Sequence, residues 1–146
     1  MAGGSGTRFW PMSRAHRPKQ FLAIGGGRTL LRETIDRVVG VVDRERIIVV
    51  TAEVHADHVC VVAPELPREN VLVEPVGRNT AACIGWATRV IERCSKDARI
   101  AVLPSDHFIG DVASFRRHLG TAFDAASDDI VLCGIVPTRA ETGYGY

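Results

Sequence analysis

The chain of 146 residues contains no acidic residue before Glu33, although the whole sequence has 17 acidic and 18 basic residues and a net charge of +1. The basic start is therefore a local feature, which argues against a general polyanion binder. The cations are also not interleaved with aromatic residues along one face, so we expect a discrete anionic ligand and no nucleic-acid partner. The cations that precede Glu33 are Arg8, Arg14, Arg17, Lys19, Arg28 and Arg32.

Clustered cysteines and long apolar runs are also absent. The cysteines show no C-x-x-C pair and no Cys/His ligand spacing, which disfavours disulfides and a zinc site. Each lies in an apolar stretch, so we expect buried free thiols in a reducing cytoplasm. No apolar run reaches 18 residues, and no signal peptide is recognisable, so we expect no membrane partner. The cysteines are Cys60, Cys83, Cys94 and Cys133.

Two kinds of segment alternate along the chain. Short β-branched runs predict strands, and amphipathic patterns predict helices. Their alternation predicts right-handed βαβ crossovers, and hence an α/β fold with a Rossmann-like, doubly wound, mostly parallel sheet. The predicted strands are 46–51, 70–74, 99–103 and 130–136, and the predicted helices are 29–39, with Thr29 as the cap, 53–63, 79–94 and 112–126.

The two ends suggest a larger domain. A glycine-rich loop of this type should follow a strand, yet only Met1 and Ala2 precede it, and the motif at 141–146 stops without a closing element. We therefore expect residues 1–146 to be the N-terminal part of one domain that is truncated at both ends.

Ligands of open α/β sheets bind beyond the carboxyl ends of the strands. Three polar, sharply turning segments have this position in the predicted topology: 3–20, 74–80 and 104–107. The sequence therefore predicts that these three segments form the site.

The first segment is suited to hold an anion. Gly3, Gly4 and Gly6 permit positive φ and close backbone approach, so successive N–H groups can turn toward the ligand. Arg8 can add a planar fork of donors and Lys19 a mobile point charge. The alternative is a flexible glycine turn with solvated arginines.

The first segment matches neither of two familiar phosphate-binding motifs. A Walker loop requires Lys-Ser or Lys-Thr after its last glycine, whereas Gly6 is followed by Thr7 and Arg8. The dinucleotide fingerprint requires a third glycine where Phe9 stands.

In the third segment, Asp106 directly follows a predicted buried strand. One carboxylate oxygen at this position can hold Mg²⁺, with waters and phosphates completing the octahedron. The alternative is that Asp106 caps the next helix or forms a turn, and the basic loop at the same edge favours the metal. His107 can orient a neighbour or simply pack.

In the second segment, Pro75 and Gly77 predict a tight turn whose backbone can approach a flat ring. Arg78, Asn79 and Thr80 stand at a helix start, where N–H groups favour anions. A plain capping role for Asn79 or Thr80 remains an alternative.

Taken together, these motifs resemble those of the sugar-1-phosphate nucleotidyltransferases. Trp10–Arg14 and Pro18–Phe21 resemble in particular the mannose-1-phosphate guanylyltransferases, whereas the thymidylyl- and uridylyltransferases of glucose 1-phosphate share only the glycine-rich start. Later motifs follow in the same order, so the resemblance spans the whole chain. They lie at 74–82, 103–109 and 134–146.

The resemblance implies a nucleotidyltransferase domain of GT-A-like fold that makes GDP-mannose and pyrophosphate from GTP and mannose 1-phosphate with Mg²⁺. It implies catalytic roles for Arg8, Lys19 and Asp106, with Asp106 as the metal ligand. Gly143 and Tyr144 would border the sugar. The implied nucleotide-binding residues are Gly3, Gly4, Gly6, Thr7, Arg8, Glu74, Pro75, Gly77, Arg78 and Asn79.

The sequence departs from the family pattern at Ala82, where a proline is expected. The family's domain also continues past the position of Tyr146, where it supplies a second metal-binding Asp and the rest of the sugar pocket. Two alternatives therefore stay open: a catalytically incomplete fragment, and a sister enzyme for another sugar 1-phosphate such as glucose 1-phosphate. The sequence is compatible with a homo-oligomer and with a cytoplasmic enzyme.

Overall fold

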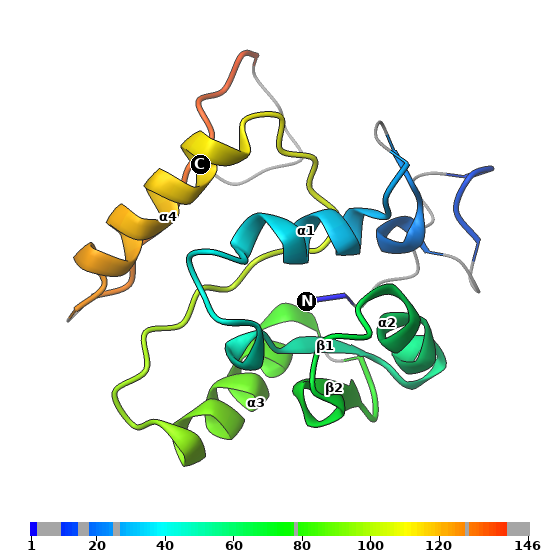
Figure 1. Ribbon diagram of the computed structural model, residues 1–146, viewed down its shortest axis with the longest axis horizontal. Helices are drawn as coiled ribbons and strands as arrows, with labels where there is room; N and C mark the ends of the chain where they lie inside the picture. Colours follow the sequence, from blue (N-terminus) through cyan, green and yellow to red (C-terminus); the bar gives the residue numbers. More distant parts are fainter. Residues whose placement is uncertain (3–9, 15–17, 25–26, 78, 128, 140–146) are drawn as a thin grey trace.

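The computed structural model describes residues 1–2, 10–14, 18–24, 27–77, 79–127 and 129–139 (Figure 1). No helix in these residues is long and apolar enough to cross a membrane. Short 3-10 turns at Lys19–Phe21, Arg44–Arg46, Glu53–His55 and Arg68–Asn70 connect the longer elements. Those elements are the helices α1 (Leu30–Val38), α2 (Ala56–Val62), α3 (Asn79–Cys94) and α4 (Val112–Ala125), and the strands β1 (Val49–Ala52) and β2 (Val71–Glu74).

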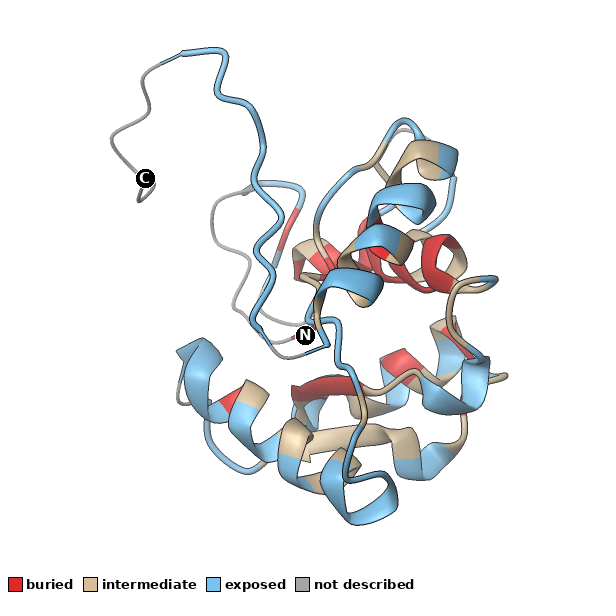
Figure 2. Cartoon of the chain, turned by 90° about the vertical axis from the view of Figure 1, so that its left-hand side faces the viewer, coloured by how far each residue is buried: buried red, intermediate tan, exposed pale blue. Residues whose placement is uncertain are grey.

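The predicted helices are confirmed with small shifts at their ends, because their signals are local. The Thr29 hydroxyl accepts a hydrogen bond from the N–H of Arg32 at 3.2 Å, which is the predicted cap of α1. The apolar face of α1 packs into the core through Leu31 and Ile35, together with Val49 of β1 and Val59 of α2. Figure 2 shows that buried residues concentrate on α1 and β1.

The strands β1 and β2 are parallel, with Val49 opposite Val71 and Ala52 opposite Glu74. Because α2 lies between them in the chain, they form the predicted βαβ unit. Met1 and Ala2 extend this arrangement on the other side of β1, since the N–H of Ala2 donates to the carbonyl of Val50 at 2.7 Å. The N-terminus accordingly lies beside β1 in Figure 1.

The predicted strands at 99–103 and 130–136 are wrong for the described structure. A strand requires a neighbouring backbone to pair with. Among the described residues, the backbone of 99–103 forms one hydrogen bond, in which the Met1 amine donates to the carbonyl of Leu103 at 3.0 Å. The later segment lies in solvent, with Ile130 91% and Leu132 88% exposed. In Figure 2 the chain leading to the C-terminus is accordingly coloured as exposed.

All four cysteines are free thiols, as predicted, but most of them are not buried. Cys83 is buried on α3, and Cys60 is half-buried. Cys94 and Cys133 are exposed because one ends α3 and the other lies in the unpaired segment 130–136.

Candidate functional site

Three chain segments leave the same edge of the sheet. Ala52 pairs with Glu74, so β1 and β2 end side by side. Ala2 is aligned with them by its bond to Val50, and the N–H of Ser105 donates to the carbonyl of Met1 at 3.2 Å. The starts of the glycine-rich segment, of the segment after β2 and of the segment around Asp106 therefore lie together, as the sequence predicted for this edge.

Lys19 and Asp106 meet at this edge. The Nζ atom of Lys19 lies 3.5 Å from Oδ2 of Asp106, and the two side chains are 25% and 42% exposed. An ion pair so open to solvent contributes at most about 1 kcal/mol to stability. Both groups remain accessible to a ligand, which matters more for function than the strength of the pair.

Asp106 does not cap the following helix. That role belongs to Asp111, whose Oδ1 accepts from the N–H of Ser114 at 2.8 Å at the start of α4. The alternative interpretation of Asp106 as a helix cap is therefore wrong, and its carboxylate is left to face Lys19.

Asp106 is held by hydrogen bonds on both sides. Ser105 before it is anchored to Met1, and the carbonyl of His107 after it accepts from Nη2 of Arg37 at 2.7 Å. Arg37 is only 4% exposed and lies over the ring of Phe115, with 5.9 Å between the guanidinium carbon and the ring centre. Burial lowers the pKa of Arg37. This buried arginine fixes the loop that carries Asp106 to α1.

Lys19 is positioned by its neighbour Gln20. The amide of Gln20 is buried and donates to the carbonyl of Ala2 at 2.7 Å, and the hydroxyl of Thr51 donates to the same oxygen at 3.4 Å. Ala2 is the last described residue before the glycine-rich segment. The turn that carries Lys19 is thereby tied to β1 and to the point where that segment begins.

The segment after β2 is open to solvent. Glu74 is half-buried, whereas Pro75, Gly77 and Asn79 are exposed. Apart from its chain neighbours, no described residue lies within 4 Å of a Cβ added to Gly77, so the described residues leave open space beside this backbone. Asn79 begins α3 with φ of 65°, a left-handed conformation that asparagine adopts more readily than most residues.

The described part of the chain has no group of three or more His, Cys, Asp or Glu side chains that could hold a metal. A single carboxylate such as that of Asp106 suits Mg²⁺ bound mainly by waters and substrate phosphates. The other predicted site residues lie outside the described residues, namely Gly3, Gly4, Gly6, Thr7, Arg8, Arg78, Gly143 and Tyr144.

Comparisons with known proteins identify the family of the chain. Residues 1–146 match the family model described as nucleotidyl transferase. The chain belongs to the nucleotidyl transferase family. A crystal structure from Thermus thermophilus, described as a mannose-1-phosphate geranyltransferase, matches 88% of this nucleotidyl transferase chain and 37% of its own, with a TM-score of 0.73 and 38% identity. The predicted α/β fold is thereby confirmed.

Several curated relatives match the nucleotidyl transferase chain over all of its residues. The mannose-1-phosphate guanylyltransferase of Escherichia coli K12 is 43% identical over 31% of its own length. The alginate biosynthesis protein AlgA of Pseudomonas putida is 40% identical over 30% of its length. The chain thus spans about a third of the length of the curated relatives it matches.

Sequence reasoning missed the roles of Gln20 and Arg37. Arg37 did leave a signal, because it shares a face of α1 with the buried Leu30 and Thr34, where an unpaired cation would be costly. Gln20 left none beyond its place beside Lys19, since its partner is a backbone carbonyl distant in sequence.

Proposed function

We propose that this chain carries the nucleotide-binding part of a mannose-1-phosphate guanylyltransferase, which joins GTP and mannose 1-phosphate into GDP-mannose and releases pyrophosphate. The observation that carries the proposal is the Lys19–Asp106 pair at the carboxyl edge of the sheet, beside the start of the glycine-rich segment. A cation and a carboxylate that are both accessible are the groups needed to bind a triphosphate together with its metal ion.

The residues divide into four groups of contacts. We assign Arg8 and Lys19 to the phosphates, together with the backbone N–H groups of Gly3, Gly4, Gly6 and Thr7. The open space beside Gly77 supports an approach of the guanine and ribose along Glu74, Pro75, Gly77, Arg78 and Asn79. Gly143 and Tyr144 would border the mannose. Asp106 would hold Mg²⁺, which supplies charge stabilisation for the triphosphate when bound.

The chemistry requires alignment and charge more than proton transfer. The phosphate oxygen of the sugar phosphate is already ionised at pH 7 and attacks the α-phosphorus in line, opposite the leaving pyrophosphate. No general base is therefore needed, which suits a site where a lysine faces an aspartate. Lys19 reduces the repulsion between the two anions and stabilises the charge that develops on the bridging oxygen.

The test is the release of pyrophosphate by the 146-residue chain with GTP, mannose 1-phosphate and Mg²⁺. Lys19→Met should lower the rate by on the order of 100-fold, the usual loss for one preorganised charge donor. Lys96→Met is a matched control, since Lys19 and Lys96 are the two lysines of the sequence and Lys96 is exposed beyond α3. Equal rates for both variants would contradict the role of Lys19.

A sister reaction is the alternative outcome of the same assay. Release with glucose 1-phosphate or with another nucleotide, and none with the mannose and guanosine pair, would assign the chain to another sugar nucleotide.

A nucleotide-binding fragment without turnover is the second candidate, favoured by the chain's coverage of about a third of its relatives. It predicts that GTP with Mg²⁺ raises the unfolding temperature while no pyrophosphate is released.

We place the function in the cytoplasm, as the four free thiols suggest.

A further inference from the structure

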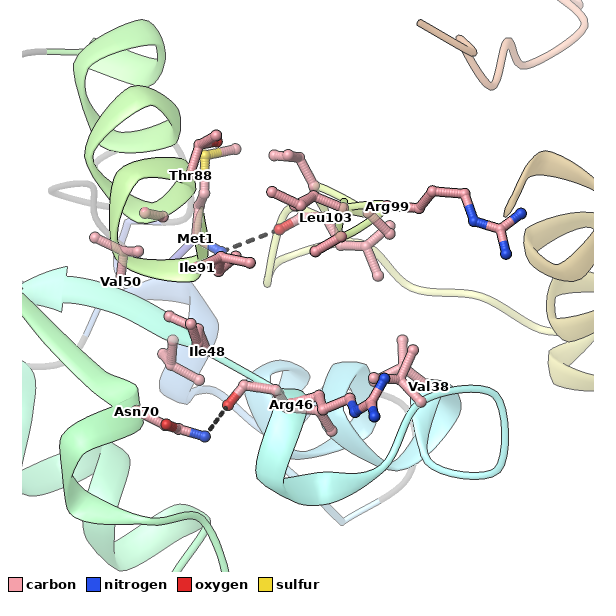
Figure 3. Close-up of a pocket in the computed structure, with 18 of the residues that line it drawn as sticks. Met1, Val38, Arg46, Ile48, Val50, Asn70, Thr88, Ile91, Arg99 and Leu103 are labelled. Atoms are coloured by element: carbon pink, nitrogen blue, oxygen red, sulfur yellow. Dashed lines mark hydrogen bonds between the residues drawn. The ribbon is translucent and has the colours of Figure 1, made fainter. Parts of the chain in front are cut away.

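The turn Lys19–Phe21, which carries one half of the ion pair in the site, is tied to the rest of the chain at two points. The first is the bond from the buried amide of Gln20 to the carbonyl of Ala2 at 2.7 Å. Ala2 is itself held in place, because its neighbour Met1 donates to the carbonyl of Leu103 (Figure 3). The turn is therefore fixed at this point to the edge of the sheet.

The second point is the ring of Phe21, which is buried in the hydrophobic core. It contacts two imidazole rings, that of His55 with 5.6 Å between the ring centres and that of His58 with 5.4 Å. His55 ends the short 3-10 turn Glu53–His55 directly after β1, and His58 lies in α2. The segment that leaves β1 thus supports the turn that carries Lys19.

One nitrogen of the His55 ring is buried without a hydrogen bond. The side chain is 5% exposed, and Nδ1 has no partner among the residues that the structure describes. An apolar ring would fill the same space without leaving a polar atom unpaired. Histidine at this position therefore lowers stability, and it differs from an apolar residue in being able to take up a proton.

A proton on His55 is incompatible with this packing. Both nitrogens of a charged imidazole carry a hydrogen, so Nδ1 would donate into a place where the described residues offer no acceptor. Burial accordingly lowers the pKa of His55, and the contact with the backbone of Val54 raises it by less. The charged ring is therefore stable only after the packing against Phe21 has opened.

The charged groups around His55 do not offset such a proton. Strand β1 carries no charged residue. The charged and titratable groups on the other elements around the ring are Lys19 of the turn, Glu53, Asp57 and His58 beside it, and Arg32 and Glu65, which are paired with each other. Among the described side chains, His58 is the one whose charge acts on the pKa of His55, and it lowers that pKa further.

We infer that His55 is a positioning residue for Lys19: its neutral ring holds Phe21 and the turn in place, whereas a proton on the ring opens the turn and withdraws the ammonium group from the site. That this ammonium group binds a triphosphate rests on the proposed function, but the link between the proton and the turn does not. The turn should open before β1 does, since it is a single turn of three residues, whereas β1 pairs with β2 along all four of its residues.

The amides of the turn report its opening directly. The N–H of Phe21 donates to the carbonyl of Pro18 and that of Leu22 to the carbonyl of Lys19, both at 3.0 Å. An open turn binds the proton with the ordinary pKa of about 6.5 and the closed turn with a lower one, so the ratio of open to closed turns should rise by about 10-fold from about pH 7.5 to 5.5. Hydrogen exchange at both amides, corrected for the pH dependence of intrinsic exchange, should lose protection by this factor.

The experiment measures this exchange in the wild-type chain and in variants of His55. His55→Phe keeps a ring but cannot take up the proton, and it should show no loss of protection at Leu22. His55→Leu tests the same point without the larger ring. His118→Gln, at an exposed position of α4, is the control and should behave as the wild type.

A purely structural role of His55 gives a different result. If the ring took up its proton only in the unfolded chain, the pH would affect the slowly exchanging amides of β1 and not the faster local opening of the turn. Unchanged protection of the turn in the wild type, or a loss that persists in both His55 variants, would overturn the inference. Turn amides that exchange no faster than those of β1 would overturn it as well.

GTP separates this inference from the proposed function. Bound GTP with Mg²⁺ should restore the protection of Leu22 at about pH 5.5, because a ligand that binds the closed turn opposes the proton. Lys19→Met should abolish this restoration. If acid opens the turn of the wild type but GTP does not protect it, the proposed function is contradicted and the role of His55 is supported.

Discussion

Lys19 and Asp106 face each other across the edge of the sheet, with 3.5 Å between the ammonium nitrogen and one carboxylate oxygen. Each is held by its neighbour in the chain: Lys19 through Gln20, and Asp106 through Ser105 and His107. The pair is therefore placed by buried contacts although it is itself accessible. Substitution of Lys19 or Asp106 should therefore change ligand binding with little change in the free energy of unfolding.

Asp106→Asn should weaken the Mg²⁺-dependent part of GTP binding by about 10-fold or more, because an amide oxygen replaces a charged ligand. The free energy of unfolding should change by less than about 1 kcal/mol, since the ion pair is exposed. Calorimetric titration with GTP, with and without Mg²⁺, measures the first effect, and urea unfolding measures the second. Asp129→Asn, at an exposed position outside the site, is the control. Identical Mg²⁺ dependence in the wild type and Asp106→Asn would contradict the assignment.

Arg37→Met should lower the free energy of unfolding by roughly 1 to 3 kcal/mol, because the carbonyl of His107 and the hydroxyl of Thr34 lose a charged donor. It should also weaken Mg²⁺-dependent GTP binding, since the loop of Asp106 loses its anchor to α1. Arg117→Met on the exposed side of α4 is the matched control and should do neither. If the free energy of unfolding falls as expected but GTP binding does not change, Arg37 supports only the fold.

Gln20→Leu and Thr51→Val should differ in size. Both remove a donor to the carbonyl of Ala2, but the bond from Gln20 is 2.7 Å long and the contact from Thr51 is 3.4 Å. We expect a loss of about 1 kcal/mol for Gln20→Leu and a smaller loss for Thr51→Val, measured by urea unfolding. The reverse order would indicate that Thr51 is the main anchor of Ala2.

His55 should make stability depend on pH. Its side chain is 5% exposed, its Nδ1 atom has no partner in the described residues, and its ring packs 5.6 Å from that of Phe21. Burial lowers the pKa of His55 below 6.5, with a further lowering from His58. The unfolded chain therefore binds the proton first, and the free energy of unfolding should fall as the pH drops from about 6.5 toward the lower pKa of the folded state.

His55→Phe should remove this fall between about pH 7.5 and 5.5, as followed by urea unfolding at both values. Asp36 does not interfere, because Arg32 lowers the pKa of its carboxyl further below 3.8 and its contribution is lost only in stronger acid. His118→Gln, at an exposed position of α4, is the control. A pH dependence that persists in His55→Phe would assign it to other groups.

The sequence predicted the elements whose signals are local. Helix α1 carries its own cap at Thr29 and its own apolar face, so no distant residue was needed to predict it. The segments 99–103 and 130–136 have the composition of buried strands, but a strand exists only with a partner, and composition does not supply one. The predicted strand 99–103 is therefore an extended segment whose Leu103 carbonyl accepts from Met1, and the predicted strand 130–136 lies in solvent.

A topological rule predicted which segments lie together at the edge of the sheet, whereas the contacts that hold them there were not predicted. Because parallel strands end at one edge of a sheet, the segments of Lys19 and Asp106 were expected there together, and their side chains lie 3.5 Å apart. The bonds of Gln20 to Ala2 and of Arg37 to His107 depend on backbone carbonyls whose positions follow only from the folded chain.

The position of Met1 also has a consequence for the order of folding. The bonds from Met1 to Leu103 and Ser105 join residues separated by 102 positions or more, whereas β1 and β2 close through a short crossover. Contacts of such sequence separation carry the larger loop-closure entropy and form late in folding. Weakening the contact at Ser105 should therefore leave the folding rate nearly unchanged and accelerate unfolding, so that the edge carrying Asp106 is the last part of the sheet to form and the first to open.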